Sequence, residues 1–522
     1  MASSTLPARY VAWCGLVIAG CSVPVLLSTH PPLYDYPFYI ARLFILTELP
    51  TNPFLSEHYF ASSFLIPNIG MELVLLPLTP ILPLEVAFDV FLILIFTSII
   101  TGTVFLHRTL FDQRSLWPLV SGVFVINWIF LFGFLTYLLG VGLFLWAIAA
   151  WIRLSRDSTG YRFLYGSLMA VGLFFVHLVA FGLYAVAVLG FEVQRALMSV
   201  HGQDRRSLSS AVRTMAYSGI QFVIPVILYF MSSTRNTGVA EGIGGIHYEL
   251  AKKLATPIVT LTSGIPWLDV LMGLTVVSGA LVVFFAGRIR ISTNILGAGI
   301  CLILVYLALP HILRPAAFVD SRIPIAMLFF LIGSLQISFP KKFGGMMLVA
   351  IISTFFVVKT IAVTNEWREH DTLIEEYFQA FDRIEEHSTL FIAMQDVPPS
   401  WARKHYLWRV GSPMHVADLA TLTGRIFAPA VFAVSGQHTI ATREKFAALK
   451  AYQSVEPIRI GDAEAFARVV EELRQLHVRV SPDRAAYLLL QDRDEDPMPL
   501  VEAVRLITSG NGFRLLQIYQ PG

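Results

Sequence analysis

The chain has 522 residues, of which 55% are hydrophobic and 14% are charged, and its formal net charge at pH 7 is +2. Soluble domains carry about 25% charged residues, so this composition excludes an ordinary soluble protein and indicates a chain that folds largely in lipid. The sequence has no basic tract of the kind that binds nucleic acid, and we therefore expect no nucleic-acid partner.

The first apolar run, 10–28, is interpreted as an uncleaved membrane anchor. It lacks the small-residue cleavage pattern of a secretory signal peptide, and many more apolar runs follow it. The three cysteines all lie in such runs, where cysteine behaves as a small hydrophobic residue. Their spacing matches no disulfide or metal-binding pattern.

Apolar runs of bilayer length recur along the first two thirds of the chain. They predict eleven membrane spans, near 10–28, 84–106, 115–132, 135–152, 163–177, 178–194, 213–231, 267–287, 292–310, 322–338 and 344–363. A further run at 66–82 contains three prolines and is predicted to form an interfacial or re-entrant helix that does not cross.

The basic residues predict the orientation of these spans. One set of connecting loops carries fourteen Lys and Arg residues and the alternate set carries six. Because basic residues are enriched in cytoplasmic loops, we expect a cytoplasmic N-terminus. The first loop, 29–83, and the C-terminus then lie on the outer side of the membrane.

The composition changes near residue 365, where apolar spans stop and charges become frequent. Patterns at 366–386 and 463–476 predict helices, and those at 390–393, 486–490 and 513–519 predict buried strands. We therefore expect a polytopic α-helical membrane domain over 1–364, followed by an extracytoplasmic α/β domain over 365–522. The second segment is long enough to bury its own core.

The first outer loop contains the strongest candidate for a catalytic group, Asp35. Asp35, Tyr39 and Arg42 fall near one face of a predicted helix. A carboxylate that is partly desolvated by aromatic side chains has a raised pKa and can accept a proton from a hydroxyl group. The alternative is that Asp35 caps the helix and Arg42 pairs with lipid headgroups. Glu57 and Glu72, the other acids of this loop, are predicted to be solvated or capping residues.

A second outer loop gathers groups that could bind an anion: His311, Arg314, Asp320 and Arg322. Guanidinium groups bind phosphate through paired hydrogen bonds, so this loop is a candidate phosphate site. The alternative is that it anchors the protein at the interface, with Asp320 capping the helix that starts near Arg322. His177 lies at an outer hairpin turn, where it is either a structural residue or a donor to a phosphate or hydroxyl.

Taken together, these segments resemble the GT-C superfamily of integral-membrane glycosyltransferases, which use polyprenyl-phosphate-linked sugars, and in particular a bacterial group of GT-C-like proteins. The resemblance extends over nearly the whole chain. It is carried by the segments 35–42, 67–72 and 132–140, by His177 and by Asp320-Ser321-Arg322, with a soluble domain after the last span.

The resemblance implies a role for several of these residues. Asp35 would be the general base that activates an acceptor hydroxyl, and Arg314 and Arg322 would stabilise the charge on the leaving phosphate. Arg42, His177, His311 and Asp320 would complete the substrate site. The expected partners are a polyprenyl-phosphate sugar, membrane lipid, and a glycan, lipid or protein acceptor, and the expected location is the bacterial inner membrane. The first loop lacks the adjacent pair of acids found in many members, which weakens the expectation of metal dependence. A divalent cation is the one cofactor left open.

Two other classes of function remain open from the sequence. One is a non-catalytic protein of the same fold that binds lipid or assists assembly, and the other is a lipid or polysaccharide transporter. An enzyme should bring Asp35 to a cavity together with Arg322 and His177. A transporter should instead have a polar path that reaches the cytoplasmic side, and a binding protein should have no exposed carboxylate in the first loop.

Overall fold

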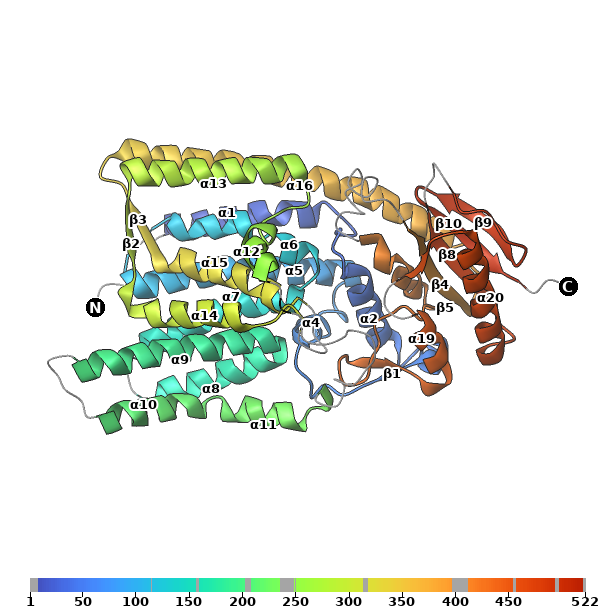
Figure 1. The fold of residues 1–522 in the computed structure, drawn as a ribbon, viewed down its shortest axis with the longest axis horizontal. Coiled ribbons are helices and arrows are strands. Elements are labelled where there is room, and N and C mark those ends of the chain that lie inside the picture. Colours follow the sequence, from blue (N-terminus) through green and yellow to red (C-terminus); the bar gives the residue numbers. More distant parts are fainter. Residues whose placement is uncertain are drawn as a thin grey trace.

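A computed structural model describes residues 8–113, 115–155, 159–201, 208–234, 248, 250–312, 318–396, 412–453, 457–492 and 497–519. The molecule is elongated, with a bundle of helices along its long axis at the N-terminal end and a β-sheet at the other end (Figure 1). The segment between the first and second long helices lies between the bundle and the sheet.

The helical part follows the apolar pattern of the sequence. Its elements are α1 (Ala8–Leu26), α2 (Tyr36–Glu48), α3 (Pro53–His58), β1 (Tyr59–Ala61), α4 (Gly70–Leu75), α5 (Leu84–Phe111), the 3-10 helix η1 (Trp117–Phe124), α6 (Trp128–Leu131), α7 (Leu135–Leu154), α8 (Thr159–Val176), α9 (Leu178–His201), α10 (Leu208–Ile220), α11 (Val223–Met231), α12 (Leu250–Val259), α13 (Pro266–Ala286), β2 (Arg288–Ile291), η3 (Thr293–Ile295), α14 (Leu296–Ala308), η4 (Asp320–Arg322), α15 (Ile323–Ser334), β3 (Leu335–Ser338) and α16 (Lys342–Phe381).

Six helices in the described part of the chain are long and apolar enough to cross a membrane: α1, α5, α7, α9, α13 and α16. Each of the eleven predicted spans overlaps one or two helical segments, but several of those are short or interrupted. The run at 66–82 forms only the short helix α4, as expected for a segment that does not cross.

The predicted span at 115–132 is wrong as a single helix, because it breaks between η1 and α6. The Asn127 side chain caps α6 by accepting hydrogen bonds from the amides of Ile129 and Phe130. The Lys359 ammonium, from α16, donates to the carbonyl oxygens of Val123 and Ile126 at 2.9 and 2.7 Å. These side chains satisfy backbone groups that the interruption leaves unpaired, so a turn forms in place of a continuous span.

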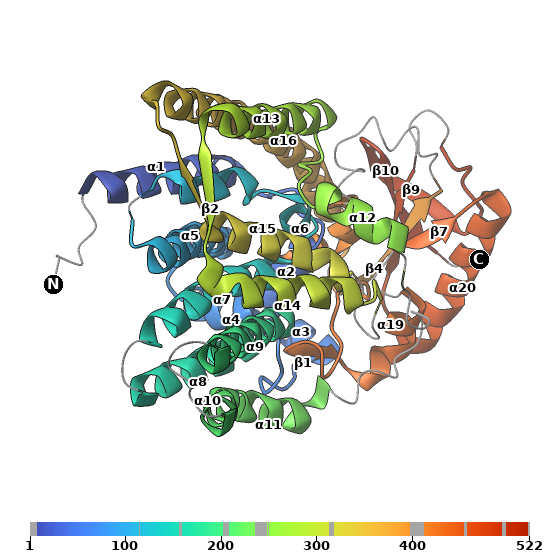
Figure 2. The same ribbon diagram turned by 60° about the vertical axis from the view of Figure 1, so that its left-hand side comes forward.

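Different secondary-structure elements lie at the two ends of the helical bundle. The N-terminus and the two-stranded ribbon of β2 and β3 lie at one end, and α2, α3, β1 and the sheet lie at the other (Figures 1 and 2). The loops predicted to be cytoplasmic therefore share the end with the N-terminus. The first loop and the C-terminal part share the opposite end.

The C-terminal part is built on a mixed six-stranded sheet. Its elements are β4 (Ser388–Gln395), η5 (Ser412–Thr423), β5 (Ile426–Phe427), β6 (Ile440–Thr442), η6 (Glu444–Phe446), α19 (Ala447–Gln453), β7 (Ile458–Ile460), α20 (Ala463–Val480), β8 (Ala486–Gln491), β9 (Val504–Gly510) and β10 (Phe513–Ile518). The main path is β5-β4-β8-β10-β9, and β7 also pairs with β4. Strands β5, β7 and β8 run parallel to β4, whereas β10 is antiparallel to both β8 and β9.

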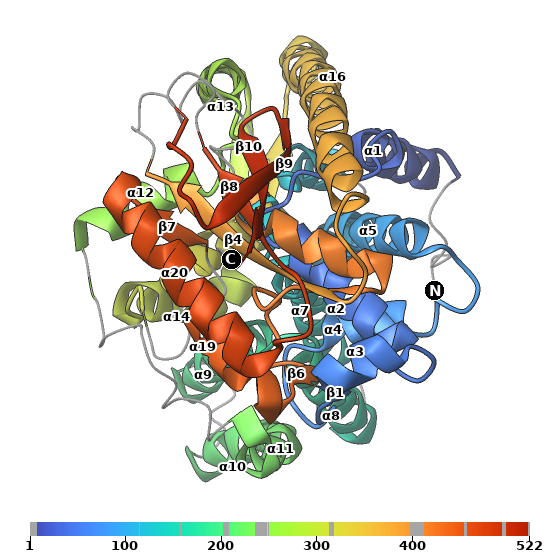
Figure 3. The same ribbon diagram turned by 90° about the vertical axis from the view of Figure 1, so that its right-hand side faces the viewer.

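The two faces of this sheet face different cores. Leu390 and Ile392 of β4 join the hydrophobic core of the helical part, where α16 covers the sheet and Tyr377 stacks on Phe513 at 4.1 Å. Phe391 and Ala393 point the other way and pack with α20 and α19, which cover the outer face (Figure 3). All eight residues of β4 are buried, as expected for a strand covered on both faces. Helix α16 runs through the predicted domain boundary at 364/365 and connects the two parts without a linker.

The first loop is docked on the C-terminal part. Strand β1 pairs with β6 in an antiparallel register that sets Tyr59 opposite Thr442. The side chain of Asn52 donates a hydrogen bond to the carbonyl oxygen of Gly424 at 2.8 Å. Ala41 and Ile45 of α2 belong to the same hydrophobic cluster as β4, β8 and α20. The C-terminal part therefore contributes to the surroundings of the predicted site.

Candidate functional site

Asp35 occupies the N-cap position of α2, and its backbone is fixed against the turn between α6 and α7. The Tyr34 amide donates to the Leu131 carbonyl at 2.8 Å, and the Tyr34 ring stacks on Phe132 with 4.6 Å between centroids. Gly133 has a φ of +95°, and a Cβ atom added there would lie 2.9 Å from the Cγ and the backbone nitrogen of Asp35. Only glycine permits this close approach with this backbone conformation.

The carboxylate of Asp35 has no hydrogen bond or ion pair among the described residues, and it does not cap α2. It remains partly exposed. Burial by the surrounding protein raises its pKa to about 8, although the nearby guanidinium groups of Arg322 and Arg42 act to lower the pKa. A general base needs a pKa near the working pH, and Asp35 meets this condition. The alternative role of Asp35 as a helix cap is wrong, because its side chain forms no capping hydrogen bond.

Tyr137 contacts both Arg322 and His177. The Arg322 guanidinium lies over the ring of Phe134 at 3.8 Å, and its carbonyl accepts a hydrogen bond from the Tyr137 hydroxyl at 2.7 Å. The Tyr137 ring meets the imidazole of His177 edge to face, with 5.2 Å between centroids. Burial, and then the charge of Arg322, lower the pKa of His177 well below its usual value. His177 is therefore a neutral group whose Nδ1 accepts from the Val179 amide at 3.2 Å.

Arg42 pairs with an acid of the first loop and not, as the alternative interpretation had it, with lipid headgroups. Its Nη2 atom forms a buried ion pair with Glu72 Oε1 at 2.9 Å, and the two side chains are only 4% and 2% exposed. The guanidinium also lies over the rings of Phe38 and Tyr39. The expectation of a solvated or capping Glu72 is wrong, and this ion pair holds the guanidinium inside the protein, away from lipid headgroups.

Asp320 is the centre of a second buried cluster. Its two carboxylate oxygens pair with the Lys253 ammonium at 3.0 Å and with His311 Nδ1 at 2.8 Å. Burial raises the pKa of Asp320, but the hydrogen bonds from Lys253 and His311 outweigh it and hold the pKa below its usual value. The helix that follows has Arg322 at its N-cap position, so the alternative in which Asp320 caps that helix is wrong. Arg314 lies outside the described residues.

An apolar cavity of about 290 Å³ lies beside the turn that contacts Asp35. Its lining residues come from α6, the α6–α7 turn, α12 and the segment before α15: Trp128, Ile129, Phe132, Phe134, Lys252, Ala255, Thr256, Val259, Thr260, His311, Phe318 and Ser321. Phe132 stacks on Tyr34, and the Arg322 guanidinium lies over the ring of Phe134. The cavity is thus adjacent to the Asp35 cluster, although its walls include neither Asp35, Arg322 nor His177.

His311 gives this cavity a polar group with a defined orientation. Its Nδ1 atom faces Asp320, so Nε2 is the ring nitrogen left for a ligand in the cavity. A carboxylate on one nitrogen of an imidazole fixes the orientation of the ring. Lys252 adds a cationic side chain to the same wall. The sequence did not predict Lys252 or Tyr137 as site residues, although Tyr137 lies in the segment 132–140 that carries the resemblance, and it gave Glu72 a solvated or capping role.

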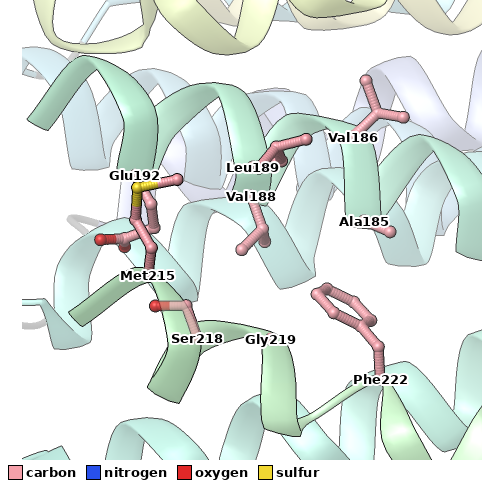
Figure 4. A pocket seen from close by; sticks show the side chains of 9 residues that line it. All are labelled: Ala185, Val186, Val188, Leu189, Glu192, Met215, Ser218, Gly219 and Phe222. Atoms are coloured by element: carbon pink, nitrogen blue, oxygen red, sulfur yellow. The ribbon is translucent and has the colours of Figure 1, made fainter. Parts of the chain in front are cut away.

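A second cavity of about 310 Å³ lies between α9 and the α10–α11 pair (Figure 4). Its lining is almost entirely apolar, and Glu192 is at one end. That carboxylate is already paired with the guanidinium of Arg162 and accepts a hydrogen bond from the Trp151 ring nitrogen. This cavity therefore offers no unpaired polar group and is not connected by any residue to the Asp35 cluster.

No group of three or more His, Cys, Asp or Glu side chains in the described part of the chain could hold a metal ion. The charged groups near Asp35 are the guanidinium groups of Arg322 and Arg42, which supply no oxygen ligands for a divalent cation.

The chain is similar in fold to a solved protein structure. No family model matches the chain, and no curated protein matches it. The solved structure is the arabinofuranosyltransferase AftD from mycobacteria, matched over 99% of this chain at 13% sequence identity and a TM-score of 0.44. This chain spans 40% of the length of that one.

Proposed function

We propose that this protein is a membrane glycosyltransferase of the GT-C type that transfers a sugar from a polyprenyl-phosphate donor to an acceptor hydroxyl. The observation that carries the proposal is the Asp35 carboxylate. It is partly exposed and has no partner among the described residues, and two guanidinium groups lie close to it. The carboxylate is unpaired and lies near an apolar cavity that has Lys252 and His311 in its wall. These are the properties of a base beside a lipid-phosphate site.

In this proposal the reaction is a single displacement. Asp35 takes the proton from the acceptor hydroxyl as that oxygen forms its bond to the anomeric carbon of the sugar. The bond from that carbon to the phosphate oxygen breaks, and its electron pair leaves with polyprenyl phosphate. Because no covalent intermediate forms, the configuration at the anomeric carbon inverts. Arg322, Lys252 and His311 supply the positive charge that stabilises the leaving phosphate, and the apolar cavity takes the first isoprene units.

The proposed orientation follows from the two ends of the bundle. The described parts of the loops predicted to be cytoplasmic lie at the end of the bundle where α1 begins and where β2 pairs with β3 (Figure 1). Basic residues favour the cytoplasmic side. We therefore place that end in the cytoplasm, and Asp35 and the C-terminal part on the periplasmic side of a bacterial inner membrane.

The donor site is tested by thermal unfolding of the detergent-purified protein with and without polyprenyl phosphate. A ligand that binds only the folded state raises the midpoint, by an amount equivalent to about 2.7 kcal/mol at a concentration of 100 Kd. We expect stabilisation of the wild type and of Asp35→Asn, and its loss in Arg322→Ala. Ala255→Trp, which fills the cavity beside Asp35, should also abolish it, whereas Ala185→Trp fills the second cavity and should not.

Stabilisation that persists in Ala255→Trp would move the lipid site elsewhere. No stabilisation of the wild type by any polyprenyl lipid would contradict the donor assignment and favour the assembly-protein alternative. Stabilisation by the lipid without any transfer to sugar, peptide or lipid acceptors would favour a lipid-binding protein of the same fold.

A further inference from the structure

The C-terminal part reaches the surroundings of Asp35 through a chain of three side chains. Thr439, next to β6, donates a hydrogen bond from its hydroxyl to Glu72 Oε1 at 3.1 Å. The same oxygen of Glu72 receives Arg42 Nη2 at 2.9 Å. Arg42 lies two helical turns after Asp35 on α2. Its guanidinium lies 5.4 Å from the ring centroid of Tyr39, whose amide donates to the Asp35 carbonyl at 3.1 Å, and its charge acts to lower the pKa of Asp35. The chain links β6, α4 and α2, which are far apart in the sequence.

We propose that Glu72 and Thr439 are positioning residues that hold the Arg42 guanidinium beside Asp35, so that the site is complete only when the C-terminal part is docked on the first loop. The inference rests on the proposed role of Asp35 as a base. The C-terminal part then influences the protonation of the Asp35 carboxylate through Thr439, Glu72 and Arg42, in addition to any role in binding an acceptor.

The ion pair between Arg42 and Glu72 is buried. Arg42 and Glu72 are both nearly inaccessible, and Arg42 Nε and Glu72 Oε2 have no hydrogen-bond partner among the described residues. A buried ion pair with unsatisfied atoms contributes little net stability, because desolvation of the two charges offsets their attraction. A role in fixing the direction of the guanidinium accounts for the pair better than a role in holding the fold together.

The position of Thr439 depends on contacts with the first loop itself. Its carbonyl oxygen accepts a hydrogen bond from the Ser62 amide at 2.7 Å, and the pairing of β6 with β1 follows directly. Undocking of the C-terminal part would therefore withdraw Thr439 from Glu72. The docking contact and the contact with Glu72 belong to the same short segment.

The charged and titratable groups around Asp35 come from three elements. Arg42 and Tyr39 lie on α2, Arg322 lies on η4, and Glu72 lies on α4 beside Arg42. The α6–α7 turn contributes Gly133, which has no side chain. Arg42 and Arg322 are the two positive charges that favour the ionised carboxylate. Arg42 is connected to the C-terminal part through Glu72 and Thr439.

The test follows the protonation of Asp35 without needing a substrate. Dicyclohexylcarbodiimide reacts with protonated carboxyl groups in apolar surroundings, so its labelling of Asp35, quantified by peptide mass spectrometry on the full-length protein, should fall as the pH rises. In the wild type we expect a midpoint near 8. In Thr439→Val the midpoint should move upward, and in Thr439→Ser, which keeps the hydroxyl, it should stay at the wild-type value.

Two further variants keep the test decisive. Thr442→Val is the matched control, because Thr442 lies on β6, which begins directly after Thr439, and the Thr442 hydroxyl has no partner among the described residues. The midpoint of Thr442→Val should equal that of the wild type. The double variant Arg42→Met with Glu72→Met removes both charges of the pair together, a change that buried pairs tolerate. Loss of a nearby opposite charge should raise its midpoint by roughly 1 pH unit or more.

Equal midpoints in the wild type, Thr439→Val and the double variant would overturn the inference. An upward shift in Thr442→Val as large as that in Thr439→Val would also overturn it, because the effect would then come from the strand and not from the hydrogen bond to Glu72. The proposed function fails by a different result, namely transfer activity that survives in Asp35→Asn, so the two failures are distinguishable.

Discussion

Replacement of Gly133 by alanine tests the geometry of the site at its tightest contact. The new methyl group would lie 2.9 Å from the Cγ and from the backbone nitrogen of Asp35, well inside a normal van der Waals distance. The backbone at this position also has a φ of +95°, which non-glycine residues rarely adopt. Either Asp35 or the turn must move to accommodate the substitution.

The expected magnitude follows from these two effects. A side chain in a sparsely populated backbone region costs about 1–3 kcal/mol, and an extra methyl group in a packed site costs about 1–3 kcal/mol. Together they predict destabilisation of about 2–6 kcal/mol if the turn stays in place. If the turn moves, part of this free energy appears as displacement of Asp35 and loss of transfer activity.

The assay is the thermal unfolding midpoint, measured together with carbodiimide labelling of Asp35 across pH. Gly182→Ala is the control, because Gly182 lies in α9 with open space around its Cα. It should be neutral or slightly stabilising, since alanine favours helix over glycine by about 1 kcal/mol. If Gly133→Ala and Gly182→Ala behave alike in both measurements, the contact between the α6–α7 turn and Asp35 is not as described.

Three other results are expected. Because Asp35 must be ionised to act as a base and its pKa is raised to about 8, the transfer rate should rise with pH through this value; a flat profile from pH 6 to 9 would contradict the assignment. Because the pKa of Asp35 is higher in the folded than in the unfolded state, the folded state should lose stability as the pH rises from the unfolded pKa of about 4 through 8. Asp35→Asn should remove this loss, which is measured by comparing unfolding midpoints at pH 6 and 9. Lys253→Met leaves the buried Asp320 with His311 as its remaining ionic partner and should cost about 3–5 kcal/mol, measured by denaturant or thermal unfolding; a cost below about 1 kcal/mol would show that the pair is solvated.

Periodicity and composition predicted most of the elements. The strands expected at 390–393, 486–490 and 513–519 are β4, β8 and β10, and the helix expected at 463–476 is α20. These segments were accessible because burial on one or both faces is encoded in the local order of apolar residues. The short strands β1 and β6 were not predicted, because each is three residues long and exists only through pairing with the other.

The candidate site could be predicted only in part. Asp35 was identified because its polar, aromatic segment stands out against the apolar runs around it. The partner of Arg42 was misjudged, because Glu72 becomes a buried ion-pair partner only when α4 folds back onto α2. Thr439 had no local signal, and Tyr137 had only its place in the segment 132–140 that carries the resemblance. Their roles depend on contacts across more than 150 positions of sequence with Glu72 and Arg322, which periodicity does not encode.

The most direct test of the central claim is release of polyprenyl phosphate from polyprenyl-phosphate sugars, with pentose and hexose donors offered to the full-length protein in lipid nanodiscs with membrane-derived acceptors. We expect the wild type to release polyprenyl phosphate with a rate that increases with pH through about 8. Asp35→Asn should still be stabilised by polyprenyl phosphate yet release none. Release by Asp35→Asn at the wild-type rate would contradict the account, because the carboxylate would then have no part in the transfer.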